Sequence, residues 1–225
     1  MTLPLVVDFL YETKKTNAKQ YIKMSITKKS LLLIFLLILI DQASKFYVKL
    51  NFQLGESVDV FSWFRITFVE NNGMAFGMEL FGKLFLTLFR IAAVVVLAVY
   101  IHKMIKRNAR TGYILAVSML LAGAAGNIVD SLFYGVIFNE STPVQIASFM
   151  PDSGGYAPFL YGKVVDMFYF PIISDNAGET IFFRYIFNVA DACVTVSVVI
   201  ILLFFRKELN ESLESKKVTE NSDEK

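Results

Sequence analysis

The feature that most constrains this chain is a strongly apolar run, residues 182–205, that carries an acid. The sequence FNVADACV places Asn188 and Asp191 inside this run. A carboxylate within a membrane span costs about 2.5–3.5 kcal/mol on insertion scales. A second acid, Asp166 in KVVDMFYF, is also flanked by apolar residues rather than by loop residues. We interpret the two acids as a pair that the rest of the chain brings together.

Composition indicates an integral membrane protein, because 55% of the 225 residues are apolar, more than an ordinary soluble domain contains. The net charge of +2 gives no support for a nucleic-acid partner. Cys193 is the single cysteine, so no intrachain disulfide can form. His102 is the single histidine, which argues against a His-based triad or a zinc site, and we expect no metal.

Four apolar segments are long enough to be membrane spans, and the predicted spans are residues 30–49, 83–101, 111–131 and 182–205. Between the first two, Phe64, Ile66 and Phe68 alternate with other residues at the period of a half-buried strand. Residues 50–80 are therefore predicted to form a small strand-rich platform with one face on lipid. Residues 132–180 contain all but one of the prolines and several glycines, and form a long outer segment.

Basic residues set the predicted orientation. Lys28 and Lys29, the loop HKMIKRNAR at 102–110 and Arg206 all fall on one side, which the positive-inside rule makes cytoplasmic. The fold class is thus an all-α membrane protein with four transmembrane helices, a small β-rich periplasmic platform and a periplasmic insertion. Its predicted parts are a cytoplasmic N-terminal extension (1–29), a membrane domain (30–206, with outer loops 50–80 and 132–180) and a disordered cytoplasmic tail (207–225).

Two neighbouring carboxyl groups titrate as a unit, so one can stay ionised and activate water while the other stays protonated and donates to a carbonyl oxygen. Asp166 and Asp191 are the candidates for such a pair. The alternative is that each acid only caps a helix or pairs with Arg184. Spacing alone leaves both interpretations open.

Polar residues recur beside these acids. Asn71, Asn127 and Asn188 can hold carboxylates and substrate backbone without adding charge, although asparagine in a membrane helix can also simply bridge helices. Asn188 and Asp191 are three residues apart, so a helix would place them on one face. Asp41 and Lys45 have i, i+4 spacing and predict an ion pair. The glycines of the third span, such as Gly123 and Gly126, favour close helix packing.

The motifs DQASK, ENNGMAFG, GAAGNIVD, VVDMFYF and FNVADA, in this order over residues 30–206, closely resemble those of the bacterial lipoprotein signal peptidases, or signal peptidase II. The resemblance implies an aspartic endopeptidase of the inner membrane that removes signal peptides from prolipoproteins ahead of a diacylglyceryl-modified cysteine. It implies no cofactor, a lipid-modified prolipoprotein substrate and contact with membrane lipid, and we expect a monomer. The implied catalytic residues are Asp166 and Asp191, supported by Asp41, Lys45, Asn71, Asn127, Asp130 and Asn188.

Three departures accompany the resemblance. Ser131 stands where the family usually has Arg after the Asp of its GNxxD motif, and our hypothesis is that Arg184 takes over part of that role. Residues 132–163 form an insertion that we expect to fold beside the site at the outer surface. Met167 replaces the usual Phe, a conservative change.

Two functions of other classes compete with the peptidase. Intramembrane acids and asparagines also mark transport pathways, but four spans without an inverted repeat, with the acids grouped toward one face, argue against a small transporter. A non-catalytic binding or assembly protein is the third possibility, and would follow if the acids were structural.

Overall fold

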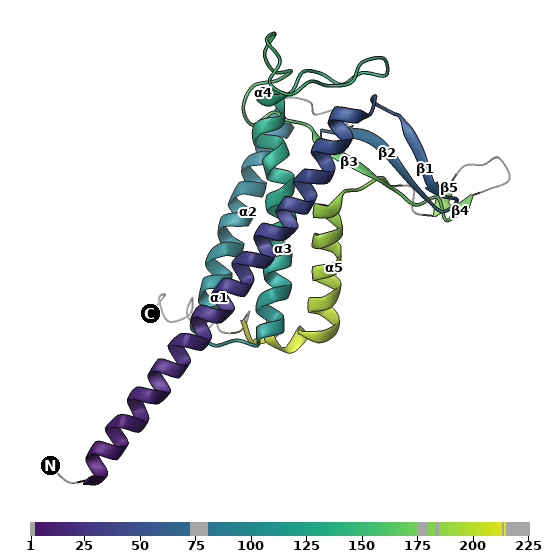
Figure 1. Ribbon diagram of the computed structural model, residues 1–225. Helices are drawn as coiled ribbons and strands as arrows, with labels where there is room; N and C mark the ends of the chain where they lie inside the picture. The colour runs from purple at the N-terminus through teal and green to yellow at the C-terminus, as the bar shows by residue number, and fades with distance from the viewer. Residues whose placement is uncertain (1–2, 73–80, 175–179, 183–184, 213, 215–225) are drawn as a thin grey trace, which may run out of the picture.

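The computed structural model describes residues 3–72, 81–174, 180–182, 185–212 and 214 (Figure 1). Its helices are α1 (Leu3–Asn51), α2 (Phe81–Lys106), α3 (Thr111–Val129), a π-helical turn η1 (Asp130–Tyr134), α4 (Gly135–Ile137) and α5 (Val189–Phe204). Its strands are β1 (Ser57–Phe61), β2 (Phe64–Asn71), β3 (Val164–Tyr169), β4 (Ile173–Ser174) and β5 (Thr180–Phe182).

Three helical stretches are long and apolar enough to cross a membrane: Ser25–Asn51, Gly82–Lys106 and Thr111–Ile137. A fourth would be α5 taken together with the short helix Arg206–Ser212, which bends away from it by 90°. Two boundaries differ from the sequence prediction. α1 is already helical from Leu3, and α5 begins at Val189 rather than at 182 because the chain before it pairs as a strand and the helix starts at a capping residue. Residues 207–212, predicted as disordered tail, are helical.

α3 packs against α1, α2 and α5, so it is the central element of the bundle (Figure 1). Two glycines allow the close approach. A Cβ atom on Gly126 would lie 2.7 Å from Asp41 Oδ2 of α1, and one on Gly123 would lie 2.9 Å from Val194 Cγ2 of α5. The packing role predicted for these glycines is therefore the one that the structure supports.

A three-stranded antiparallel sheet with order β1-β2-β3 extends sideways from one end of the bundle (Figure 1). The predicted strand is present as β2, but its burial does not alternate: Phe68 is fully buried, whereas the residues from Phe64 to Thr67 are all half-buried. The sequence did not predict that β3 completes the sheet. In that strand Asp166 pairs with Val69 of β2, so the sheet carries one of the two candidate acids.

The chain after α4 folds back on the end of the helix that precedes it. Tyr156 N–H donates to Phe138 O (2.9 Å), Ala157 N–H to Gly135 O (2.9 Å) and Gly162 N–H to Ser131 O (2.9 Å). The predicted insertion thus packs as a compact loop above α3, and its last residues lead directly into β3.

Two buried apolar clusters lie at different levels of α3. One includes Tyr113, Val117 and Leu121 with Ile201 of α5. The other includes Tyr134 and Phe138 with residues of α1 and the sheet. Asn127 of α3 and Asp130 of η1 lie between these levels, so these two buried polar residues lie between two apolar clusters.

Candidate active site

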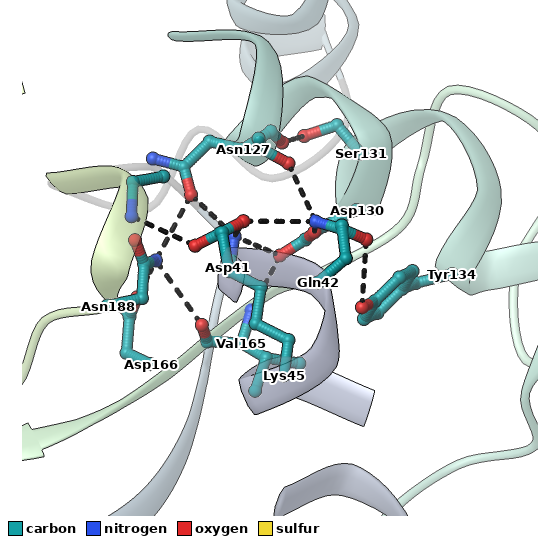
Figure 2. Close-up of polar contacts among 12 residues, drawn as sticks. Asp41, Gln42, Lys45, Asn127, Asp130, Ser131, Tyr134, Val165, Asp166 and Asn188 are labelled. Carbon is teal, nitrogen blue, oxygen red and sulfur yellow. Dashed lines mark hydrogen bonds and ion pairs between the residues drawn. The ribbon is translucent and has the colours of Figure 1, made fainter. Parts of the chain in front are cut away.

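All eight residues that the sequence singled out lie together where the bundle meets the sheet. Figure 2 shows Asp41, Lys45, Asn127, Asp130, Asp166 and Asn188 among them. The eight residues come from six elements: Asp41 and Lys45 from α1, Asn71 from β2, Asn127 from α3, Asp130 from η1, Asp166 from β3, and Asn188 and Asp191 from the start of α5. Segments that are distant in sequence therefore form one polar cluster.

Asp191 lies in the first turn of α5 rather than in the middle of an apolar helix. Asn188 is the N-cap residue: its Oδ1 accepts from Asp191 N–H (2.9 Å), and Asp191 Oδ2 accepts from Asn188 N–H (3.4 Å). This reciprocal pair is a capping box. The alternative that Asp191 caps a helix therefore holds for one of its oxygens, Oδ2. The other oxygen, Oδ1, accepts from Asn127 Nδ2 at 2.8 Å.

Asp166 is almost fully buried, at 3% exposure, and is held by two amides. Asn188 Nδ2 donates to its Oδ1 (2.6 Å) and Asn71 Nδ2 donates to its Oδ2 (3.3 Å). Burial, followed by the charge of Asp191, raises the pKa of Asp166 from 3.8 to about 7, against the opposing effect of the two amide donors. Asp166 is therefore able to hold a proton near neutral pH.

Two asparagines connect the acids. Asn188 Nδ2, which donates to Asp166, also donates to Asn127 Oδ1 (3.0 Å), and Asn127 Nδ2 donates to Asp191. A continuous series of hydrogen bonds thus runs from Asp166 through both amides to Asp191. Each amide uses its donor and acceptor groups within the site, which fixes the orientation of both carboxyl groups.

Lys45 is a fully buried cation with three acceptors. Its Nζ lies 2.9 Å from Asp41 Oδ2, 2.9 Å from Asp130 Oδ2 and 2.9 Å from Asn127 Oδ1. An ammonium has three donors, so all of them are used. The predicted ion pair between Asp41 and Lys45 is present, and it is extended to α3.

The two acids that pair with Lys45 also hold the backbone beside the candidate pair. Asp41 Oδ1 accepts from Ala190 N–H (2.9 Å), one residue before Asp191. Asp130 Oδ2 accepts from Val165 N–H (3.2 Å), one residue before Asp166. Both candidate acids are therefore positioned through the same buried ion cluster.

Sequence reasoning missed Gln42. Its Nε2 donates to Asp41 (3.0 Å), Asp130 (2.9 Å) and Gly126 O (3.1 Å), and its Oε1 accepts from Tyr134 Oη (3.1 Å), as Figure 2 shows. Its place beside Asp41 in DQASK was the available signal. Gln42 spans the two acids of the ion cluster.

Ser131, the departure from the family pattern, lies near Arg90 of α2. Arg90 Nη1 is 3.5 Å from Ser131 Oγ, which in turn donates to Asn127 O (3.1 Å). Arg184, which we expected to compensate for Ser131, lies outside the described residues. Within those residues, no three His, Cys, Asp or Glu side chains are arranged to hold a metal ion.

Comparisons with known proteins agree on one family. Residues 33–206 match the family model described as signal peptidase (SPase) II. The lipoprotein signal peptidase of Porphyromonas gingivalis is 42% identical over 195 residues, covering 82% of this chain and 86% of that protein. The lipoprotein signal peptidase of Amoebophilus asiaticus is 30% identical over 203 residues, covering 84% and 82%.

The fold also has a solved counterpart. A bacterial membrane enzyme determined by the in meso method at 1.9 Å resolution superposes with a TM-score of 0.56 at 24% identity, covering 78% of this chain and 91% of that one. From the family match over most of the chain, the chain belongs to the signal peptidase II family of lipoprotein signal peptidases.

Proposed function

We propose that this protein is an aspartic endopeptidase of the bacterial inner membrane that removes signal peptides from prolipoproteins ahead of a diacylglyceryl-modified cysteine. Family membership supports the substrate class. The observation that carries the aspartic mechanism is the series of hydrogen bonds joining Asp166 to Asp191 through Asn188 and Asn127.

In this mechanism the two acids have different roles. Asp166, with a pKa raised to about 7, carries the proton and donates it to the carbonyl oxygen of the scissile bond. Asp191 is less deeply buried and acts as the ionised general base. It removes a proton from the attacking water as the water oxygen bonds to the carbonyl carbon. The proton then passes from Asp191 to the leaving nitrogen as the C–N bond breaks. At the same time a hydroxyl proton of the tetrahedral intermediate returns to Asp166 as the carbonyl re-forms, so both acids regain their starting protonation states.

The asparagines are the residues we assign to orientation. Asn188 donates to Asp166 and caps α5, so it couples the position of the strand acid to the first turn of the helix. Asn71 donates to the second oxygen of Asp166 from β2. With both oxygens held, rotation of the Asp166 carboxyl group is restricted before substrate binds.

The membrane arrangement belongs to the proposal. We propose four spans, with α5 and the bent segment after it as the fourth, both termini in the cytoplasm and the site near the outer face. The basic loop 102–110 supports this orientation. From Thr111 at the start of α3 to Asp130 at the start of η1 the helix rises about 29 Å at ~1.5 Å per residue, close to the ~30 Å thickness of a bilayer core. The diacylglyceryl chains of the substrate then remain in lipid while the peptide bond reaches the acids.

Substitution of each acid tests the proposal. Asp166→Asn and Asp191→Asn each remove one proton-transfer group, so cleavage of a lipidated prolipoprotein by the purified enzyme should fall by at least about 10²–10⁴-fold. Precursor and product are separated by their shift on a gel. Asp152→Asn, at an exposed position in the insertion, is the matched control and should cleave normally. Normal turnover in either Asp166→Asn or Asp191→Asn would exclude the two-acid mechanism.

A further inference from the structure

A groove of about 180 Å³ lies between α1 and α2, at the end of the bundle opposite the sheet (Figure 1). α1 lines it with a face that runs from Thr27 to Ile34, and α2 with a face that runs from Ala98 to Ile105. Both faces have the i, i+3, i+4, i+7 spacing of a helix stripe, and Leu121 of α3 also contributes. The groove is therefore separate from the candidate acids and is largely apolar.

Ser30 is a buried polar residue of this groove. It is 2% exposed, and its Oγ has no hydrogen-bond partner among the residues that the structure describes. A helical serine commonly donates to the carbonyl one turn earlier, as Ser118 does to Ile114 O (2.7 Å). A buried hydroxyl without such a partner costs free energy. Ser30 can therefore offer its hydroxyl to a ligand.

The charged residues of the two lining segments are all basic, because residues 25–40 and 91–110 contain no Asp or Glu. Lys28 is three residues before Leu31, and Lys106 is four residues after His102, so each lies beside the lining face. A helical side chain leans toward the N-terminus of its helix, which directs Lys106 back over the groove. Both lysines are exposed, and neither forms an ion pair within the described part of the chain.

An apolar groove with a free hydroxyl and cations at its end matches the chemistry of an anionic phospholipid. The groove is similar in volume to the ~150 Å³ apolar cavity that binds benzene, so it can hold a section of one hydrocarbon chain. Basic pockets between membrane helices on the cytoplasmic side bind anionic lipid head groups. The amino-terminal region of a signal peptide is itself positively charged, so these lysines would repel it.

We propose that the groove between α1 and α2 binds one anionic phospholipid of the cytoplasmic leaflet. Part of an acyl chain lies in the groove, an ester oxygen accepts from Ser30 Oγ, and the phosphate lies between Lys28 and Lys106. Ser30 is ~3 Å deeper along α1 than Lys28, which agrees with the order of ester and phosphate in the lipid. The leaflet follows from the proposed orientation, whereas the site itself does not depend on the peptidase mechanism.

The test is native mass spectrometry of the purified full-length protein with equal amounts of phosphatidylglycerol and phosphatidylcholine that have the same acyl chains. The protein should retain one phosphatidylglycerol in preference to phosphatidylcholine. Lys28→Gln combined with Lys106→Gln should weaken its binding about fivefold for each lysine, so about 30-fold in all. Arg206→Gln combined with Lys207→Gln removes two exposed cations at the same end of the bundle, and this matched control should retain the lipid.

A second pair of variants tests the groove itself. Ala98 lines the groove and is exposed, so the ring of Ala98→Phe should fill the groove without disturbing the core and should abolish retention of phosphatidylglycerol. Val99→Phe adds the same ring at the next residue of α2, which is 50% exposed and is not part of the lining. It should retain the lipid as wild type does.

Ser30→Ala tests the hydroxyl. Loss of one hydrogen bond should weaken the binding of phosphatidylglycerol and of phosphatidylcholine alike, by about 2- to 10-fold. The thermal unfolding temperature of the lipid-free variant should not fall, because the lost hydroxyl has no partner in the described part of the chain. A lower unfolding temperature would mean that the hydroxyl already stabilises the fold, and would overturn its assignment to a ligand.

Equal retention of the two lipids, or normal retention by Ala98→Phe, would overturn the lipid site. Displacement of phosphatidylglycerol by a synthetic signal peptide with a basic amino-terminal region would assign the groove to substrate instead. These outcomes are separate from failure of the proposed function, because retention is measured without cleavage. Asp166→Asn should bind phosphatidylglycerol as wild type does, and turnover by that variant would exclude the two-acid mechanism without affecting the lipid site.

Discussion

At the scale of single residues, the cluster holds more acid than base. The cluster contains four carboxyl groups, those of Asp41, Asp130, Asp166 and Asp191, and one fully buried cation, Lys45, which pairs with Asp41 and Asp130. Lys45 uses its three donors on Asp41, Asp130 and Asn127, so it gives Asp166 little direct support. Burial of the carboxyl group, followed by the charge of Asp191, raises the pKa of Asp166 to about 7 and is the reason that a proton remains on it.

The raised pKa of Asp166 predicts a pH-dependent stability. The unfolded chain releases this proton near pH 3.8, whereas the folded protein keeps it to about pH 7. The folded state therefore binds more protons between these values, and its free energy of unfolding should fall as the pH rises through that window and then level off. Asp166→Asn cannot ionise, so the part of this decline that Asp166 causes should be absent from the variant.

The measurement is the thermal unfolding temperature of the detergent-solubilised protein from pH 4.5 to pH 8. The amide that replaces the carboxyl group of Asp166 would meet the donors of Asn71 and Asn188, so the variant has an offset of its own and only the difference in slope is informative. Asp152→Asn should follow the wild-type curve. Parallel curves for wild type and Asp166→Asn would show that Asp166 is already ionised throughout this range.

At the scale of elements, the sequence predicted which segments are helical better than where they begin. The long apolar run concealed the start of α5, although Asn188 and Asp191 have the spacing of a capping box. β3 was equally ambiguous, because a short apolar run fits a buried strand or a helix segment. Pairing with β2 decides the conformation of β3, and that contact is between residues almost a hundred positions apart.

The residues of the site were easier to predict than their contacts. Motif order identified all eight residues, because each motif is short and continuous in the chain. The hydrogen bonds from Asp41 to Ala190 and from Asp130 to Val165 join different motifs, so only the folded structure reveals them. Gln42 was missed as a site residue for the same reason.

We predict that the geometry of the site depends on the close approach of α1 and α5 to Gly126 of α3. In Gly126→Ala the new Cβ of α3 would lie 2.7 Å from Asp41 Oδ2 of α1 and 3.0 Å from Ala190 Cβ of α5. Both helices must therefore move away from α3. We expect the free energy of unfolding to fall by about 1–3 kcal/mol. We also expect a large loss of cleavage, because Asp41 Oδ1 accepts the hydrogen bond from Ala190 N–H, one residue before Asp191. The free energy of unfolding and the cleavage rate are measured on the same preparation.

Gly112→Ala is the matched control for this variant. It is also in α3, but its new Cβ would meet only the ring of Phe205, a side chain that can turn away. It should lose less stability and should cleave at nearly the wild-type rate. Equal activity losses in the two variants would mean that close packing anywhere along α3, rather than at the site, controls cleavage.

At the scale of the whole molecule, the sheet and the insertion are joined to the bundle by a second buried cation. Lys49 of α1 contacts Glu70 of β2 and donates to Ser141 of the insertion (2.9 Å), and Lys163 bridges Glu70 and Glu140. The rings of Phe68, Phe138 and Tyr156 lie within 6 Å of the Lys49 ammonium. The insertion is therefore attached to the frame that carries Asn71, and we expect it to stay in place when substrate enters.

The proposed four-span arrangement predicts which parts of the molecule share one side of the membrane. In a background in which Cys193, the single cysteine, is replaced by Ser, new cysteines are introduced one at a time at His102, Val144 and Glu211, all of which are exposed. A membrane-impermeant thiol reagent should label Val144→Cys in intact spheroplasts. His102→Cys and Glu211→Cys should react only after the membrane is opened, because four crossings return the chain to the cytoplasm.

Glu211→Cys decides between four crossings and three. If α5 entered the membrane and the bent segment Arg206–Ser212 returned to the outer side, Glu211→Cys would be labelled together with Val144→Cys, and the C-terminal part of the chain would be periplasmic. Labelling of His102→Cys in intact spheroplasts would instead reverse the whole orientation. The candidate acids lie on the Val144 side of the bundle, so reversal would place the site toward the cytoplasm, opposite to the proposed arrangement.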